Sequence, residues 1–240
     1  MSIGDHGYWD RWNRTWRFGT ELDTFMQRQR ETALAVVREH RIHDARILDI
    51  GCGTGWLGHE LRQFGRVWGI DLSADAIQEG GRKHPDLTLI CGNFLEMDLP
   101  GPFDVVVSAD ALPHMSNYEG FFHRISELVK PGGLLLLMTQ NPFVWQRRSS
   151  IRHVPDALPH AHPREWPSRS RITRSLQPAF VIERLTTLDP GGDQGWLWWV
   201  ENRYVRRGMG LLVGRNRWRS VLERLGVGRG LVIVARRQPA

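Results

Sequence analysis

The segment from residue 46 to residue 139 most constrains the fold, because short apolar runs alternate there with amphipathic stretches. The apolar runs are typical of buried strands, and the stretches between them place apolar residues three and four positions apart, as helices do. In chain order the sequence predicts a strand at 46–50, a helix at 55–64, a strand at 66–70, a helix at 73–83, strands at 87–91 and 103–108, a helix at 118–129 and a strand at 134–139. Strands that alternate with helices in this way form a mostly parallel sheet covered on both faces. We therefore expect an α/β fold.

The two flanks of this core follow different patterns. An amphipathic helix is predicted at 20–42, after an aromatic segment at 8–12. Beyond the core, 141–167 is irregular and rich in proline, histidine and arginine; a helix at 168–176 and strands at 180–188 and 231–235 follow. We expect a single domain over 1–240, with an N-terminal helical lid at 1–45, the core at 46–139, and insertions on the substrate side of the sheet at 140–178 and 189–229.

Composition excludes several classes of protein. With 41% hydrophobic and 10% aromatic residues the chain can bury a core, which excludes disorder as its main state. Its longest apolar run, 134–138, is far shorter than the ~20 residues of a membrane-spanning helix. The two cysteines, Cys52 and Cys91, exclude a disulfide scaffold or a cysteine-built zinc site, and the first residues show no secretory leader. We therefore expect a cytoplasmic protein without a membrane span.

Charge is distributed unevenly along the chain. Residues 1–140 carry 14 basic and 19 acidic side chains, a net charge of −5, whereas residues 141–240 carry 18 basic and 7 acidic ones, a net charge of +11. All but two of the 32 basic residues are arginines, which bind phosphate and carboxylate groups bidentately. An anionic substrate or partner and a mere compositional bias toward arginine both explain this pattern.

A glycine-rich loop directly follows the first predicted strand, which ends with Asp49 and Ile50 before Gly-Cys-Gly-Thr-Gly at 51–55. Glycines adopt positive φ angles and let a ligand approach the backbone. NAD-dependent enzymes place a G-x-G-x-x-G loop here, but this loop is G-x-G-x-G. Asp49 would repel a pyrophosphate, yet it can orient a ligand that carries an ammonium group. Asp71 ends the second strand about twenty residues later, where an acid accepts both ribose hydroxyls of an adenosine group.

Four motifs together resemble those of class I S-adenosylmethionine-dependent methyltransferases, of the small-molecule or ubiquinone-biosynthesis type. They are Asp49 with the glycine loop, Asp71, Phe-Asp-Val-Val-Val-Ser at 103–108 and Leu-Val-Lys-Pro-Gly-Gly at 128–133. Their order and spacing are those of the family, and they cover 46–139. The resemblance implies a Rossmann-like, mostly parallel seven-stranded sheet, S-adenosylmethionine as cofactor and S-adenosylhomocysteine as product.

The resemblance also implies which residues bind the cofactor: Tyr8, Asp49, Gly51, Cys52, Gly53, Gly55, Asp71, Leu72, Asn93, Phe94 and Ala109. Gly51 and Gly53 would pass under the methionine part, and Asp71 would hold the ribose. Asn93 stands where the family more often has aspartate, and its amide carbonyl can still accept a hydrogen bond from the adenine amino group. Tyr8 begins a segment that resembles an aromatic N-terminal lid, although a packing role fits Tyr8 equally well.

A hydroxyl acceptor usually needs a general base, which histidine supplies near neutral pH. His114 follows the fourth strand at its carboxyl end, the edge at which open parallel sheets bind ligands. A structural role for His114 is the alternative, and the other candidates for the base are His153, His160 and His162 in the irregular segment after the fifth strand.

Three further groups have both a functional and a structural interpretation. His160 and His162 alternate as two metal ligands can, but no carboxylate cluster accompanies them, so we predict no metal site. Trp196 and Trp199 have helical spacing, which favours a core position over a substrate-stacking wall. The arginines of 203–207 fit either a solvated helix face or a phosphate site.

The sequence therefore predicts methyl transfer to a small-molecule acceptor, most simply to a hydroxyl of a sugar or a secondary metabolite. One alternative is N-methylation of a small amine. Another is RNA modification through the basic C-terminal half. An RNA-binding module is not recognised, however, and Ser-Ala-Asp-Ala at 108–111 replaces the N-P-P-[FYW] motif of many nucleic-acid methylases. A protein that binds the cofactor without catalysis is a third alternative.

Overall fold

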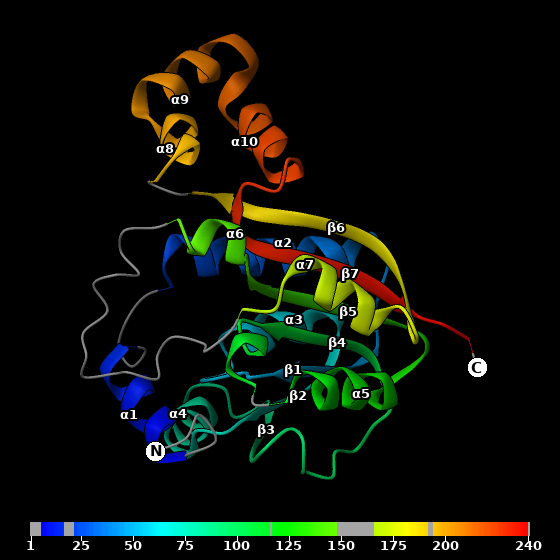
Figure 1. The fold of residues 1–240 in the computed structure, drawn as a ribbon. Coiled ribbons are helices and arrows are strands. Elements are labelled where there is room, and N and C mark those ends of the chain that lie inside the picture. The colour runs from blue at the N-terminus through cyan, green and yellow to red at the C-terminus, as the bar shows by residue number, and fades with distance from the viewer. Residues whose placement is uncertain (1–5, 17–21, 116, 148–165, 192–193, 240) are drawn as a thin grey trace.

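A seven-stranded sheet organises the computed structural model, which describes residues 6–16, 22–115, 117–147, 166–191 and 194–239 (Figure 1). Its spatial order is β3-β2-β1-β4-β5-β7-β6, and β7 alone runs antiparallel to its neighbours. The strands are β1 (Ala45–Ile50), β2 (Gly65–Asp71), β3 (Thr88–Cys91), β4 (Phe103–Ala109), β5 (Val129–Gln140), β6 (Phe180–Pro190) and β7 (Gly228–Arg237). The predicted α/β fold with a mostly parallel sheet is confirmed.

Helices cover both faces of the sheet because successive strand side chains point to opposite sides. In β1, Ile47 packs with the helices α2 and α3 on one face, while the adjacent Leu48 packs with α5 and α7 on the other. The helices of the body are α1 (His6–Trp16), α2 (Thr24–Glu39), α3 (Trp56–Leu61), α4 (Ala74–Lys83), α5 (Tyr118–Leu128), α6 (Pro142–Trp145) and α7 (Arg169–Leu176), with the short turns η1 (Arg62–Phe64) and η2 (Leu112–His114).

Side-chain caps set several helix starts. Asp23 Oδ1 accepts a hydrogen bond of 2.8 Å from the Met26 amide at the start of α2, and Ser73 Oγ accepts one of 3.1 Å from the Ala76 amide at the start of α4. The fifth strand begins at Val129 rather than at 134, because Val129 pairs with Phe103. The Lys-Pro-Gly-Gly stretch at 130–133 follows this pair and shifts the register of the two strands, and regular pairing resumes with Val105 and Leu134.

Helix α7 lies at the end of the segment predicted as the insertion 140–178. The helix α7 buries Ile172 and Leu176 completely against the sheet. This end of the predicted insertion at 140–178 therefore helps to cover the sheet. Among the described helices, none is long and apolar enough to cross a membrane.

Three helices between β6 and β7 stand off the edge of the sheet (Figure 1). They are α8 (Trp196–Glu201), α9 (Arg203–Met209) and α10 (Arg215–Arg224), and the π-helical turn η4 (Gly210–Gly214) joins the last two. We call residues 196–225 the helical arm. The prediction that Trp196 and Trp199 are core residues is wrong, because their exposed fractions are 53% and 66%. Leu197, between them, is completely buried.

Candidate active site

A cavity of about 400 Å³ lies at the carboxyl edge of the parallel strands. Residues at or just beyond the ends of β1, β2, β3, β4 and β5 contribute to its wall, as expected for an open α/β sheet. Helices α1 and α2 add Trp9, Trp12, Asn13, Met26 and Gln29 to the wall. A cavity of this size accommodates a nucleoside-sized ligand.

The glycine loop brings bare backbone to this cavity. Gly51, Gly53 and Gly55 have φ angles of 72°, 55° and 78°, which side-chain-bearing residues rarely adopt. The amides of Gly51 and Cys52 both donate to the Ile70 carbonyl, at 2.8 and 3.1 Å, and this ties the loop to β2. A Cβ at Gly53 would meet no atom within 4 Å, so open space lies above this residue. A Cβ at Gly51, by contrast, would lie 2.5 Å from the Cβ of Ala111.

Asp71 is held rigidly at the end of β2. Its Oδ2 accepts a hydrogen bond of 2.8 Å from the Gly53 amide, and its Oδ1 accepts one of 2.9 Å from the Ser73 amide. Burial raises the pKa of this carboxyl, while the bonds from Ser73 and Gly53 oppose that rise. Each carboxylate oxygen has a second lone pair, so the fixed carboxylate can also accept hydrogen bonds from a diol.

Four of the eleven predicted cofactor residues lie behind the cavity wall. Asp49 is buried beneath the loop, where burial first and the charge of Asp71 second raise its pKa to about 7. Cys52 packs its sulfur against Gly69, and Gly55 begins α3. Tyr8, a residue of α1, is buried and is not part of the wall. The cavity is lined by the other seven: Gly51, Gly53, Asp71, Leu72, Asn93, Phe94 and Ala109.

The Asn93 amide is already engaged within its own turn. Its Oδ1 accepts a hydrogen bond of 3.1 Å from the Leu95 amide, and its Nδ2 donates one of 2.7 Å to Glu96. These bonds fix the orientation of the amide and leave Oδ1 one further lone pair. Phe94 is buried and meets the ring of Phe121 edge to face, with centroids 5.5 Å apart.

Helix α1 covers the cavity with two tryptophans of the aromatic segment at 8–12. Trp9 and Trp12 line the wall, whereas Tyr8 packs edge to face on Trp9 at 5.0 Å. Asp10 docks the helix onto the start of α4, since its Oδ1 accepts hydrogen bonds from Ser73 Oγ at 2.7 Å and from the Asp75 amide at 3.1 Å. The three-residue spacing of Trp9 and Trp12 places both rings on one face of the helix, toward the cavity.

His114 reaches the cavity from η2 after β4. Its ring meets Trp9 edge to face, with centroids 4.8 Å apart, and its Nδ1 has no hydrogen-bond partner among the described residues. Burial lowers the pKa of His114 to about 4, so the imidazole is neutral at physiological pH. The alternative bases His153, His160 and His162 lie outside the described residues.

A polar pair beside His114 was missed from the sequence. Gln29 of α2 donates a hydrogen bond of 2.8 Å to Asp110 Oδ2, and both side chains line the cavity. Asp110 holds a φ of 59°, a conformation that is uncommon for residues other than glycine and recurs at functional sites. The signal was a buried glutamine on the apolar face of α2.

Metal binding finds no support in the part of the chain that the structure describes, where no group of three or more histidine, cysteine, aspartate or glutamate side chains could hold an ion. His160 and His162, which the sequence analysis considered as metal ligands without predicting a site, lie outside that part.

Comparison with known proteins gives a family and a fold. The profile of a family described as "Methyltransferase domain" matches residues 18–179. A ubiquinone biosynthesis O-methyltransferase from Bradyrhizobium sp. (strain ORS 278) is 34% identical over 101 residues. That match covers 40% of this chain and 40% of the length of the relative.

Two solved structures share the fold at low sequence identity. An N-methyltransferase from Bradyrhizobium japonicum WM9, in complex with S-adenosyl-L-homocysteine, has a TM-score of 0.62 at 15% identity and covers 98% of this chain and 100% of its own. A magnesium protoporphyrin IX methyltransferase from Synechocystis PCC 6803, also with bound S-adenosyl-homocysteine, has a TM-score of 0.62 at 17% identity. The match covers 96% of this chain and 94% of that protein.

Proposed function

This chain belongs to the class I S-adenosylmethionine-dependent methyltransferases, and from that membership we propose that it transfers the methyl group of its cofactor to a hydroxyl of a small molecule. The observation that carries the proposal is His114, a neutral imidazole that lines the cavity. The acceptor class that we favour is a sugar or a secondary metabolite.

The residues of the cavity fit S-adenosylmethionine. Gly53 leaves room above its backbone that a side chain would fill, and Asp71 presents two fixed oxygens to the same space. On this proposal the glycine loop holds the methionine part, Asp71 holds the ribose, and the turn at Asn93 and Phe94 meets the adenine. When bound, the cofactor supplies an electrophilic methyl group on a positively charged sulfur.

The chain itself then has three tasks: to align the acceptor, to exclude water and to remove one proton. Trp9 and Trp12 of α1 close the cavity with apolar rings. A ring nitrogen of His114 accepts the hydroxyl proton as the acceptor oxygen forms its new bond. A ring with a pKa of about 4 is a weak base, but it suffices because the oxygen becomes strongly acidic as that bond forms.

The proposal is tested by following an isotopically labelled methyl group. The purified protein is incubated with the labelled cofactor and with a cell extract separated into small molecules, RNA and protein, and mass spectrometry locates the label. We expect an O-methylated small molecule that the His114→Ala variant fails to form. Label on a nitrogen, in the RNA fraction or in no fraction would contradict the proposal.

A further inference from the structure

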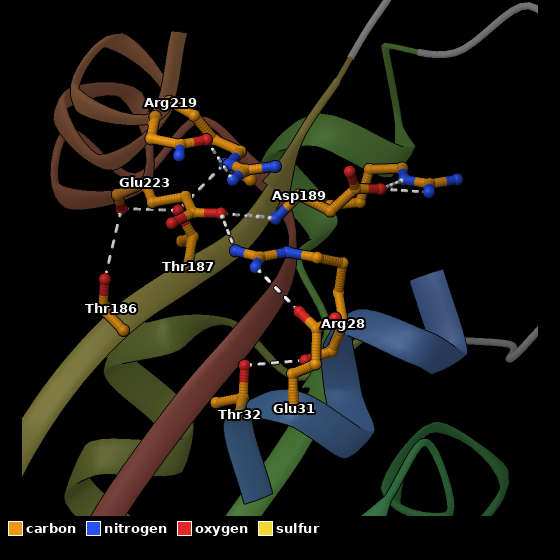
Figure 2. A network of polar contacts seen from close by, with 11 residues as sticks. Arg28, Glu31, Thr32, Thr186, Thr187, Asp189, Arg219 and Glu223 are labelled. Atoms are coloured by element: carbon orange, nitrogen blue, oxygen red, sulfur yellow. Dashed lines mark hydrogen bonds and ion pairs between the residues drawn. The ribbon is translucent and has the colours of Figure 1, made fainter. Parts of the chain in front are cut away.

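The helical arm is firmly anchored at its base. Leu197 and Leu222 of the arm are buried together with Val144 of α6 and Val227 before β7. A polar network adds to this contact (Figure 2): Glu223 Oε1 lies 3.2 Å from Arg28 Nη2 and accepts a hydrogen bond of 3.1 Å from the Asp189 amide. The arm is therefore a fixed part of the molecule at its base.

The outer part of the arm exposes apolar side chains that the body of the molecule buries. Figure 1 shows the segment that joins α9 to α10 at the end of the arm furthest from the sheet. In that segment Leu211 and Leu212 have exposed fractions of 82% and 79%. Over the described residues, every strongly exposed large apolar side chain except Val181 lies in the arm or, as Phe143 does, packs against Trp196 of the arm. A concentration of this kind marks an interaction surface.

Basic residues outnumber acidic ones in the same arm. The arm contains seven arginines, at 203, 206, 207, 215, 217, 219 and 224, and two glutamates, at 201 and 223. Glu223 faces Arg28 and Asp189 at the base, so its charge is directed to the body. The exposed aromatic residues of the arm are three tryptophans and a tyrosine: Trp196, Trp198, Trp199 and Tyr204.

We propose that the helical arm docks the protein on the surface of a membrane that contains anionic lipid. Leucines enter the hydrocarbon boundary, tryptophan and tyrosine favour the interface because they combine an apolar ring with a polar group, and arginine binds lipid phosphates. The arm presents all three classes on one projection. This inference goes beyond the proposed function and does not depend on the acceptor.

The same observations argue against two other binding partners for the helical arm. A second copy of the chain, bound arm to arm, would bring its seven arginines against the same seven, and like charges oppose such pairing. RNA would engage the arginines and tryptophans, but it gives no reason for the most exposed side chains to be the aliphatic Leu211 and Leu212.

The position of the arm places the cavity near the proposed membrane. The arm leaves β6 and returns to β7 at the sheet edge where Gln140, at the end of β5, pairs with Gly230. Gln140 also lines the cavity. The arm and the cavity therefore share one edge of the sheet, which suits an acceptor that arrives from the lipid surface.

The test is sedimentation of the full chain with phosphatidylcholine vesicles, with and without about one-third phosphatidylglycerol. We expect binding only with the anionic lipid, and weaker binding as salt rises. The Leu211→Ser/Leu212→Ser variant and the Arg215→Gln/Arg217→Gln variant should each bind at least about tenfold more weakly. Both pairs are exposed, so the variants should fold.

Matched controls separate docking from general effects. Val181→Ser removes an exposed apolar side chain from β6, and Arg66→Gln/Arg174→Gln removes two exposed arginines outside the arm; both variants should bind as the native chain does. Failure to bind anionic vesicles, or binding that the arm variants leave unchanged, would overturn the proposal. So would light scattering that shows a dimer which Leu211→Ser/Leu212→Ser dissociates, or saturable RNA binding with no vesicle binding.

Discussion

The cavity edge of the sheet and the helical arm use the same residue types in opposite ways. Strand β1 buries five of its six residues. At the end of the neighbouring β2, the backbone amides of Gly53 and Ser73 fix the Asp71 carboxylate by hydrogen bonds. Helix α9 buries none of its residues, and the adjoining η4 exposes Leu211 and Leu212. Apolar side chains are therefore buried and stabilise the fold at the cavity edge, whereas in the helical arm they are exposed and available for binding.

The largest expected effect belongs to the cavity edge. If His114 is the base, His114→Ala should lower turnover about 10²–10⁴-fold while the affinity for S-adenosylhomocysteine scarcely changes. His123→Ala, on the exposed surface of α5, should leave both unchanged. If His153→Ala, His160→Ala or His162→Ala abolishes turnover while His114→Ala stays active, the base lies in the segment after α6. Activity in all four variants would favour an amine acceptor.

The pH dependence of turnover sharpens this prediction. An ordinary histidine would make turnover rise through an apparent pKa of 6–7, which is what the sequence alone predicts. Burial lowers the pKa of His114 to about 4, so its ring stays neutral and active well below pH 6. The native enzyme should therefore show no loss of turnover from His114 between pH 8 and pH 6. An inflection at 6–7 that His114→Ala removes would contradict the buried, neutral ring.

The sequence predicted most of the cavity edge because local signals are strong there. A buried strand, positive-φ glycines and an acid at the next strand end each depend on a few neighbouring residues, and Gly51, Gly53 and Asp71 all line the cavity. For the N-terminal part the sequence predicted a helical lid at 1–45 but not the contact of Gln29 with the cavity, because that contact depends on long-range packing. Helical spacing wrongly predicted burial of Trp196 and Trp199, since among the described residues no second layer covers these two side chains.

Stability should separate the base of the arm from its outer end. Leu222→Ala removes a side chain that is 3% exposed and leaves a cavity, so it should lower the free energy of unfolding by about 2–5 kcal/mol. Leu211→Ala, at 82% exposure on the same arm, should change it by less than about 0.5 kcal/mol. Urea denaturation followed by circular dichroism measures both. Equal losses in the free energy of unfolding would show that the outer end of the arm is packed as tightly as its base.

Cofactor affinity should depend on the cavity edge and not on the arm. Asp71→Ala removes the charge-assisted hydrogen bonds that we assign to the ribose, each worth about 1.5–3 kcal/mol, so calorimetry should show affinity for S-adenosylhomocysteine falling at least about tenfold. Asp98→Ala, an exposed aspartate on the loop before β4, serves as the matched control and should bind normally. Unchanged binding by Asp71→Ala would contradict the assignment of the ribose to Asp71.

The smallest effect concerns the ion pair that connects the two regions. Arg28 of α2 and Glu223 of the arm lie 3.2 Å apart and are both partly buried, whereas Arg28 also meets the exposed Glu31 at 3.1 Å. Glu223→Gln keeps an acceptor for the Asp189 amide but removes the charge, so it should lower the free energy of unfolding by about 0.5–1 kcal/mol at low salt. Glu31→Gln should cost less, because water screens that pair more strongly. Denaturation at low and high salt measures both losses, and the loss for Glu223→Gln should shrink less with salt than that for Glu31→Gln. Equal losses for the two variants would mean that water screens the Arg28–Glu223 pair as strongly as the surface pair, and that this ion pair adds nothing specific to the anchoring of the arm.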